Sequence, residues 1–203
     1  MLRITLSPTF FTLALTVLVG GCAIFGLDNI PKFGTCDGKS DLTRIPGWDI
    51  AYQAEADCNF PDPADTSLAM HIFYIEWNKR FGDRSDRVLR NLNKMFIEWE
   101  PELMSFDRGY RLDGTFIEQG KASGLTFTQD YVAVHIEKNE PIYKTSLVHE
   151  LVHASIRATN RDTHGDPDHE GTKYYGWTKE HTELISEVNE ILKLMDLRNA
   201  KEN

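Results

Sequence analysis

The sequence predicts an α+β domain in which helices cover a small, mainly antiparallel sheet. Apolar residues recur at helical spacing over residues 65–81 and 85–96, and again in two segments nearer the C-terminus. Between these segments, residues 115–137 alternate or run β-branched between glycine and aspartate turn residues, which is typical of strands. Both patterns occur within a length that suits one domain, so we expect a single core built from helices and strands.

The N-terminus has the features of an export signal. Arg3 is followed by an apolar run over residues 10–19 and by two glycines just before Cys22. This apolar run is too short for a stable membrane span, so we expect residues 1–21 to be a signal peptide that takes no part in the fold. The run Val19-Gly20-Gly21-Cys22 resembles a bacterial lipobox, which implies that Cys22 becomes the first mature residue and carries the lipid. The alternative is an ordinary secretory signal in which Cys22 is incidental.

Removal of the signal leaves 182 of the 203 residues (203 − 21), and the loss of Arg3 changes the formal net charge from −9 to −10. We expect residues 22–40 to form a lipid-anchored tether and residues 41–203 a single domain. An acidic chain without a block of Lys and Arg argues against a nucleic acid partner, because such binding depends on phosphate neutralisation.

Cysteine usage fits a compartment outside the cytoplasm. Once Cys22 is assigned to the lipid, Cys36 and Cys58 remain as a pair, and an even count favours a disulfide between them. Two free thiols or a soft-metal site are the alternatives, and no C-x-x-C spacing supports the second.

The first half of the domain is expected to begin with an irregular cap and continue with helices. Residues 41–63 are rich in Gly and Pro, so little regular structure is expected there. Asp65 is expected to cap the first helix and Gly82 to end it. A second helix begins near Ser85, and its end at residues 95–99 is equally consistent with a strand.

Three strand-like segments follow, and we expect them to form an antiparallel meander. They are residues 115–118, 124–128 and 131–137. In the last one, alternation places Val132, Val134 and Ile136 on one face and Tyr131, Ala133, His135 and Glu137 on the other. For His135 we favour a surface position over a role in a site.

The next helix carries the motif His149-Glu150-Leu151-Val152-His153. It is expected to begin between residues 141 and 145 and to run to about Thr159. Residues four apart lie on one helix face, so both imidazoles can reach one cation, and Glu150 can lie beside a metal-bound water without being a ligand. Two neutral imidazoles suit Zn²⁺, and the carboxylate can take a proton from the activated water. Thr178 is expected to cap a final helix whose inner stripe is Leu184, Val188, Ile191, Leu192 and Met195.

At this motif the chain resembles the zincin metallopeptidases. The resemblance rests on five residues and their setting, and it covers the second half of the protein. It implies a zincin-like fold, in which the motif helix lines a cleft below an exposed edge strand that pairs with an extended substrate. It also implies zinc as the cofactor, Glu150 as the group that moves the proton, and a peptide or protein amide as the substrate.

The third zinc ligand does not follow the best-known patterns. The metzincin extension requires Gly at position 156 and His at position 159, where this chain has Ile156 and Thr159. We favour His169, which follows the rigid acidic turn Asp166-Pro167-Asp168. His164, in a His-Gly pair that resembles the ligand of SprT-like proteins, and Glu180, in the manner of the gluzincins, are the alternatives.

Other residues in or next to the loop expected at residues 163–176 have weaker assignments. Tyr174 or Tyr175 can donate a hydrogen bond to the oxyanion formed in hydrolysis, although packing is the simpler role for both. Trp177 is expected to anchor the loop. Gly171-Thr172 and Tyr175-Gly176 resemble the Gly-Thr and Tyr-Gly pairs of the aspzincins, whose Asp is missing here.

We therefore expect a zinc-dependent peptidase of the bacterial cell envelope, held to the membrane through Cys22. Ala23 in place of Asp after that cysteine resembles sorting to the outer membrane in Gram-negative bacteria. The alternative is a non-catalytic lipoprotein whose zinc site is structural or vestigial and which serves as a binding or assembly module. A metal carrier, with a shallow site and no substrate groove, is a third reading.

Overall fold

The computed structural model describes residues 41–55, 61–106, 109–110, 116–117, 120–159 and 176–202. All of them belong to one compact unit, Lys32–Asn203. The expected signal peptide and tether lie outside the described residues, as do Cys22, Cys36 and Cys58. Within the described ranges, no helix is long and apolar enough to cross a membrane.

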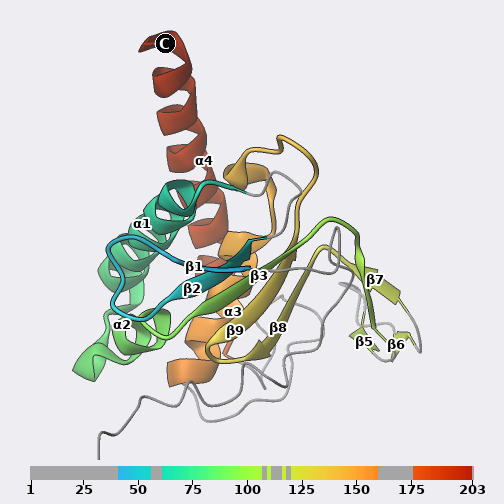
Figure 1. Cartoon of the computed structure of the whole chain (residues 1–203). Coiled ribbons are helices and arrows are strands. Elements are labelled where there is room, and N and C mark those ends of the chain that lie inside the picture. Colours follow the sequence, from blue (N-terminus) through green and yellow to red (C-terminus); the bar gives the residue numbers. More distant parts are fainter. Residues whose placement is uncertain are drawn as a thin grey trace, which may run out of the picture. The chain divides into compact units, whose positions relative to one another are not determined.

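A mixed five-stranded sheet forms the centre of the domain (Figure 1). Its central strand, β3 (Phe96–Glu100), is parallel to both neighbours, and the outer strands are antiparallel to theirs. The other members, in spatial order, are β1 (Asp41–Arg44), β2 (Tyr52–Glu55), then β9 (Tyr131–His135) and β8 (Gly124–Thr128) beyond β3.

Two small antiparallel pairs complete the described strands. They join β4 (Met104–Phe106) to β7 (Gly120–Ala122), and β5 (Gly109–Tyr110) to β6 (Phe116–Ile117). Four of the six strand pairings are thus antiparallel and two are parallel. The prediction of an α+β domain with a small, mainly antiparallel sheet is confirmed.

Four α-helices accompany the sheet in the described part of the chain. They are α1 (Pro63–Phe81), α2 (Arg87–Leu92), α3 (Leu147–Thr159) and α4 (Lys179–Glu202), with 3₁₀ turns at Arg84–Asp86 and Ile142–Lys144. Figure 1 shows α3 crossing behind β9 and β8, and α1 and α4 lie against each other. One face of the sheet therefore shares a core with the helices, to which Ile97, Trp99, Val132 and Val134 contribute.

Several expected boundaries are wrong, each for a local reason. Residues 41–55 are not an irregular cap, because β1 and β2 form a hairpin whose second strand pairs with β3. The first helix is capped by Asp62, whose carboxylate accepts a hydrogen bond from the Ala64 amide at 2.8 Å, and not by Asp65. Gly82, at φ 71°, ends it as expected.

The second half differs less from expectation. Residues 96–100 are a strand, which was one of the two readings of that segment. The meander is wrong in part: β8 and β9 pair, whereas β6 pairs with β5 in a separate sheet. Helix α3 begins two residues after the expected range, because Ile142–Lys144 forms a 3₁₀ turn. Met195 is exposed, so the inner stripe of α4 ends at Leu192.

Candidate functional site

The motif helix α3 packs its apolar side into the core, and its two histidines lie on a different side of the helix. Leu147, Val148, Leu151 and Val152 are all buried, whereas His149 and His153 are half-buried. The Leu147 amide donates to Thr145 Oγ1 at 3.3 Å, which satisfies one of the free N–H groups at the start of the helix.

The two histidine rings converge as the motif predicted. Their Nε2 atoms are 3.1 Å apart, and the rings meet edge to face with centroids 4.8 Å apart. Two imidazole nitrogens on one tetrahedral zinc at ~2.05 Å each would lie ~3.3 Å apart. The separation in the protein is within a few tenths of an ångström of that value, so the pair fits a shared cation.

Trp177 packs against both histidines. Its ring centroid lies 5.2 Å from that of His149 and 4.8 Å from that of His153, and the residue is only 2% exposed. Its indole N–H donates to Thr182 Oγ1 at 3.1 Å on the first turn of α4. Trp177 therefore limits how far either imidazole can turn, which is more than the anchoring role expected from the sequence.

Glu150 points away from the histidines, into the contact between α3 and β8. It is 4% exposed, and its Oε2 accepts a hydrogen bond from Thr126 Oγ1 at 2.6 Å. Burial raises the pKa of Glu150 to about 7, although the Thr126 hydrogen bond and the positive charge of Arg157 act in the opposite direction.

Gly124, the first residue of β8, leaves the space that Glu150 occupies. A Cβ built at this position would lie 2.5 Å from Ser146 Oγ and 2.8 Å from Glu150 Cδ, and closer still to Glu150 Oε1. Any side chain at position 124 would therefore displace the carboxylate. Sequence reasoning missed this contact, because a glycine opening a strand carries no signal of what lies opposite.

In the part of the chain that the structure describes, no strand pairs with the outer side of β8, and its register shows which backbone groups face that side. The His135 amide donates to Ser123 O at 2.8 Å, so this is a hydrogen-bonded pair, and Leu125 with Ala133 is the next. Gly124 and Thr126 lie between these pairs, and their N–H and C=O groups point away from β9. Arg157 in the last turns of α3 donates to Thr126 O at 2.6 Å.

Among the described residues, no third candidate ligand is gathered around the pair. Glu180 is described and exposed, and the described residues contain no group of three or more His, Cys, Asp or Glu side chains that can hold a metal. His164, His169, Tyr174 and Tyr175 lie outside the described residues. His135 is half-buried on the inner strand β9, where its Nδ1 lies 3.0 Å from Glu100 O.

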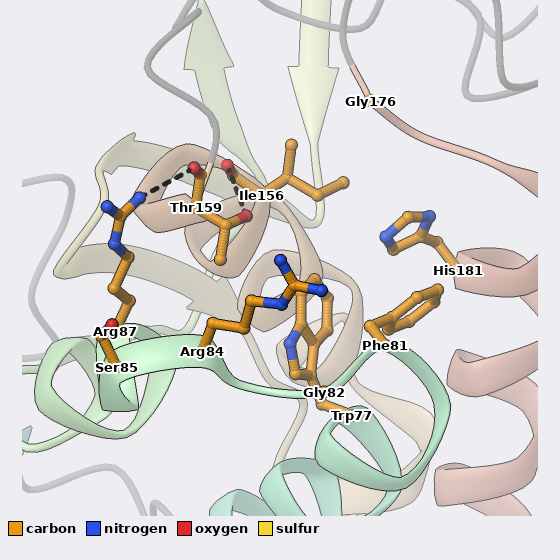
Figure 2. A pocket seen from close by; sticks show the side chains of 10 residues that line it. All are labelled: Trp77, Phe81, Gly82, Arg84, Ser85, Arg87, Ile156, Thr159, Gly176 and His181. Atoms are coloured by element: carbon orange, nitrogen blue, oxygen red, sulfur yellow. Dashed lines mark hydrogen bonds between the residues drawn. The ribbon is translucent and has the colours of Figure 1, made fainter.

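A pocket of about 500 Å³ opens beyond the C-terminal end of α3 (Figure 2). Its wall includes Ile156, one turn beyond His153, and His181, whose ring lies 5.9 Å from that of Trp177. The pocket thus lies on the same side of α3 as the histidine pair.

A comparison with protein-family models, with curated proteins and with solved structures found no match to this chain.

Proposed function

We propose that the chain is a zinc-dependent hydrolase of the cell envelope, acting as a peptidase, with His149 and His153 as zinc ligands and Glu150 as general base. The observation that carries this proposal is the 3.1 Å approach of the two Nε2 atoms, on a helix whose Glu150 carboxylate lies against β8. The resemblance of the motif to the zincin metallopeptidases supports the same reaction class.

The ligand set needs one more protein donor. Catalytic zinc commonly takes three protein ligands and keeps one position open. His169 is our first choice for the third ligand, and His164 or Glu180 replaces it if that choice fails. When bound, the zinc would supply a Lewis acid that polarises the substrate carbonyl and makes water more acidic.

Glu150 is suited to move the proton. A carboxylate in this position, held by the Thr126 hydroxyl, can accept a proton from water and release it later to the leaving amine. The Thr126 hydroxyl holds Oε2 at 2.6 Å, and Oε1 lies against the face of β8 at Gly124. This arrangement orients the base toward the strand on which the substrate is expected.

The substrate backbone would bind along β8. This strand ends the sheet, and the outward N–H and C=O groups of Gly124 can pair with an extended peptide. Arg157 already occupies the outward carbonyl of Thr126, so pairing is expected at Gly124 first. A peptide or protein amide is the substrate class that such pairing favours.

A second candidate function follows from the burial of Glu150. A carboxylate that is 4% exposed and bonded to Thr126 can equally be a structural group, which favours a non-catalytic lipoprotein with a structural or vestigial zinc site. Such a protein would serve as a binding or assembly module.

Metal analysis beside a hydrolysis assay separates the two functions. We expect one zinc per wild-type chain, loss of zinc in His149→Ala and His169→Ala, and retention of zinc without hydrolysis in Glu150→Gln. Unchanged turnover of the same substrate by Glu150→Gln would exclude the role of general base. Stoichiometric zinc in both His169→Ala and His164→Ala would exclude the loop as the source of the third ligand.

The membrane attachment has its own test. We propose that Cys22 carries a lipid and holds the protein to a membrane of the cell envelope, the outer membrane being our first choice. Cys22→Ala is expected to move the protein from the membrane fraction to the supernatant. Incorporation of labelled fatty acid into this variant would show that the lipid is attached elsewhere.

A further inference from the structure

The pocket beyond the end of α3 has an apolar wall. Trp77, Phe81 and Ile156 line it, and the ring of His181 stacks on Phe81 with centroids 4.3 Å apart and 13° between the planes. His181 is only 6% exposed, and its Nδ1 accepts a hydrogen bond from the Thr178 amide at 2.9 Å, so the ring is held against Phe81 and adds to the apolar surface. A volume of about 500 Å³ is within the range of sites for small organic molecules.

Two arginines flank this wall. Figure 2 shows the side chain of Arg84 extending across the pocket toward Trp77 and Phe81, whereas that of Arg87 extends toward the end of α3. Arg87 Nη1 lies 3.5 Å from Thr159 O, where the partial negative charge of a helix C-terminus attracts a cation. Arg87 therefore has a structural role, and Arg84 is the cation directed at the pocket.

Three of the nearby carboxylates are engaged elsewhere. Asp83 accepts from the Val88 and Leu89 amides at 3.1 and 3.0 Å, and Glu183 and Glu187 bond to Arg80. Across the ranges that the structure describes, Arg84 forms no ion pair. Its charge is thus available to an anion, although the chain as a whole is acidic at −9.

The backbone between the two arginines is in an uncommon conformation. Ser85 and Asp86 have φ of 65° and 51°, the left-handed region that L-residues other than glycine seldom adopt. Two such residues in succession place Arg84 and Arg87 on the rim of one pocket. Strained conformations of this kind gather at ligand sites, where the surrounding structure holds them.

We propose that this pocket binds a carboxylate attached to an apolar body, with Arg84 bonding the carboxylate and Trp77, Phe81 and His181 packing against the body. The carboxylate comes from a free organic acid or from the C-terminal residue of a peptide, and both present the same chemistry. The site does not depend on a metal or on the hydrolase activity proposed above.

The test compares each acid with its neutral amide by isothermal titration calorimetry on the whole chain. The probes are 3-phenylpropionate and the peptide Ala-Ala-Ala-Phe with a free C-terminus, each beside its amide. Binding of either acid about tenfold or more tightly than its amide supports the site, because a hydrogen-bonded charge contributes at least that much. Which acid binds more tightly identifies the source of the carboxylate. Equal binding of acid and amide overturns the proposal.

Variants test whether the probe binds in this pocket. Arg84→Gln is expected to remove the preference for the acid, and Arg84→Lys to restore part of it. Arg90→Gln, an exposed arginine of α2 that does not line the pocket, is the matched control and keeps the preference. A preference that persists in Arg84→Gln overturns the proposal. So does a preference that vanishes when His149 and His153 are both replaced by Ala in a folded chain, since the acid would then be bound to metal at the histidines.

Discussion

Replacement of Gly124 by Ala tests whether β8 sets the position of Glu150. The added methyl group would lie 2.8 Å from Glu150 Cδ and 2.5 Å from Ser146 Oγ. Glu150 has a flexible side chain, but it is only 4% exposed and bonded to Thr126 at 2.6 Å, so it has little room to turn aside. Carbon atoms in contact are normally ~3.5 Å or more apart, so the carboxylate must shift by about 0.7 Å. Overpacking of this kind typically costs about 1–3 kcal/mol of unfolding free energy.

The expected loss of activity is larger than the loss of stability. A general base contributes roughly 10²–10⁴-fold, and most of this contribution depends on reach to the water. We therefore expect Gly124→Ala to lower kcat by about 10²-fold or more while zinc content stays unchanged, since His149 and His153 lie on another side of α3.

A destabilised control separates the two effects. Gly82→Ala meets no atom within 4 Å but forces a side chain onto φ 71° with ψ 160°, a conformation essentially confined to glycine, so it costs roughly 1–3 kcal/mol with no expected change in turnover. Both variants are compared by chemical denaturation, zinc content and hydrolysis of a substrate cleaved by wild type. Full turnover by Gly124→Ala, on a substrate whose cleavage Glu150→Gln abolishes, would refute the reasoning.

Three further predictions concern other described residues. Burial raises the pKa of Glu100 to about 8 from an unfolded value near 4.5, so its contribution to stability is complete below pH 4.5 and is lost as pH rises through 8. In wild type this loss of unfolding free energy is on the order of 3 kcal/mol between pH 5 and 9, and Glu100→Gln should remove it. Urea denaturation across this pH range measures it, and the same slope of unfolding free energy against pH in both proteins would contradict the prediction. Asp62→Ala should cost about 1 kcal/mol as a lost helix cap, and equal effects of Asp62→Ala and Asp65→Ala would argue against the observed start of α1. Co²⁺ binding should quench tryptophan fluorescence in wild type far more than in Trp177→Phe, because this indole lies 4.8 Å from the ring of His153, and equal quenching would place the metal elsewhere.

Periodicity alone was sufficient for the long elements. Helix α3 ends at Thr159 as expected, and Val132, Val134 and Ile136 face the core as their alternation indicated. These segments bury one continuous stripe, which leaves a clear signal in the sequence. The hairpin of β1 and β2 leaves no such signal in the sequence, because each strand has only four residues and the loop between them is rich in turn formers. Its pairing with β3 depends on residues about 40 positions away, which local patterns do not reveal.

The candidate site shows the same division between local and distant determinants. The spacing of His149 and His153 on one helix was enough to predict that their rings converge, since four residues make about one turn. The surroundings of Glu150 were beyond local reasoning, because Gly124, Thr126 and the motif meet only in the folded chain. Figure 1 shows that meeting as the crossing of α3 with β8.

The geometry of α3 links the two halves of the candidate site. Adjacent residues on a helix are separated by roughly 100°, so His149 and Glu150 cannot point in the same direction. The histidines therefore face Trp177, while the carboxylate lies against β8, and Glu150 can act on a group held by the histidines only from a position between these two directions. If β8 holds Glu150 at that position, then activity depends on the packing of the strand as strictly as on the ligands. Gly124→Ala changes that packing and leaves every proposed ligand in place, so it separates a catalytic carboxylate from a structural one.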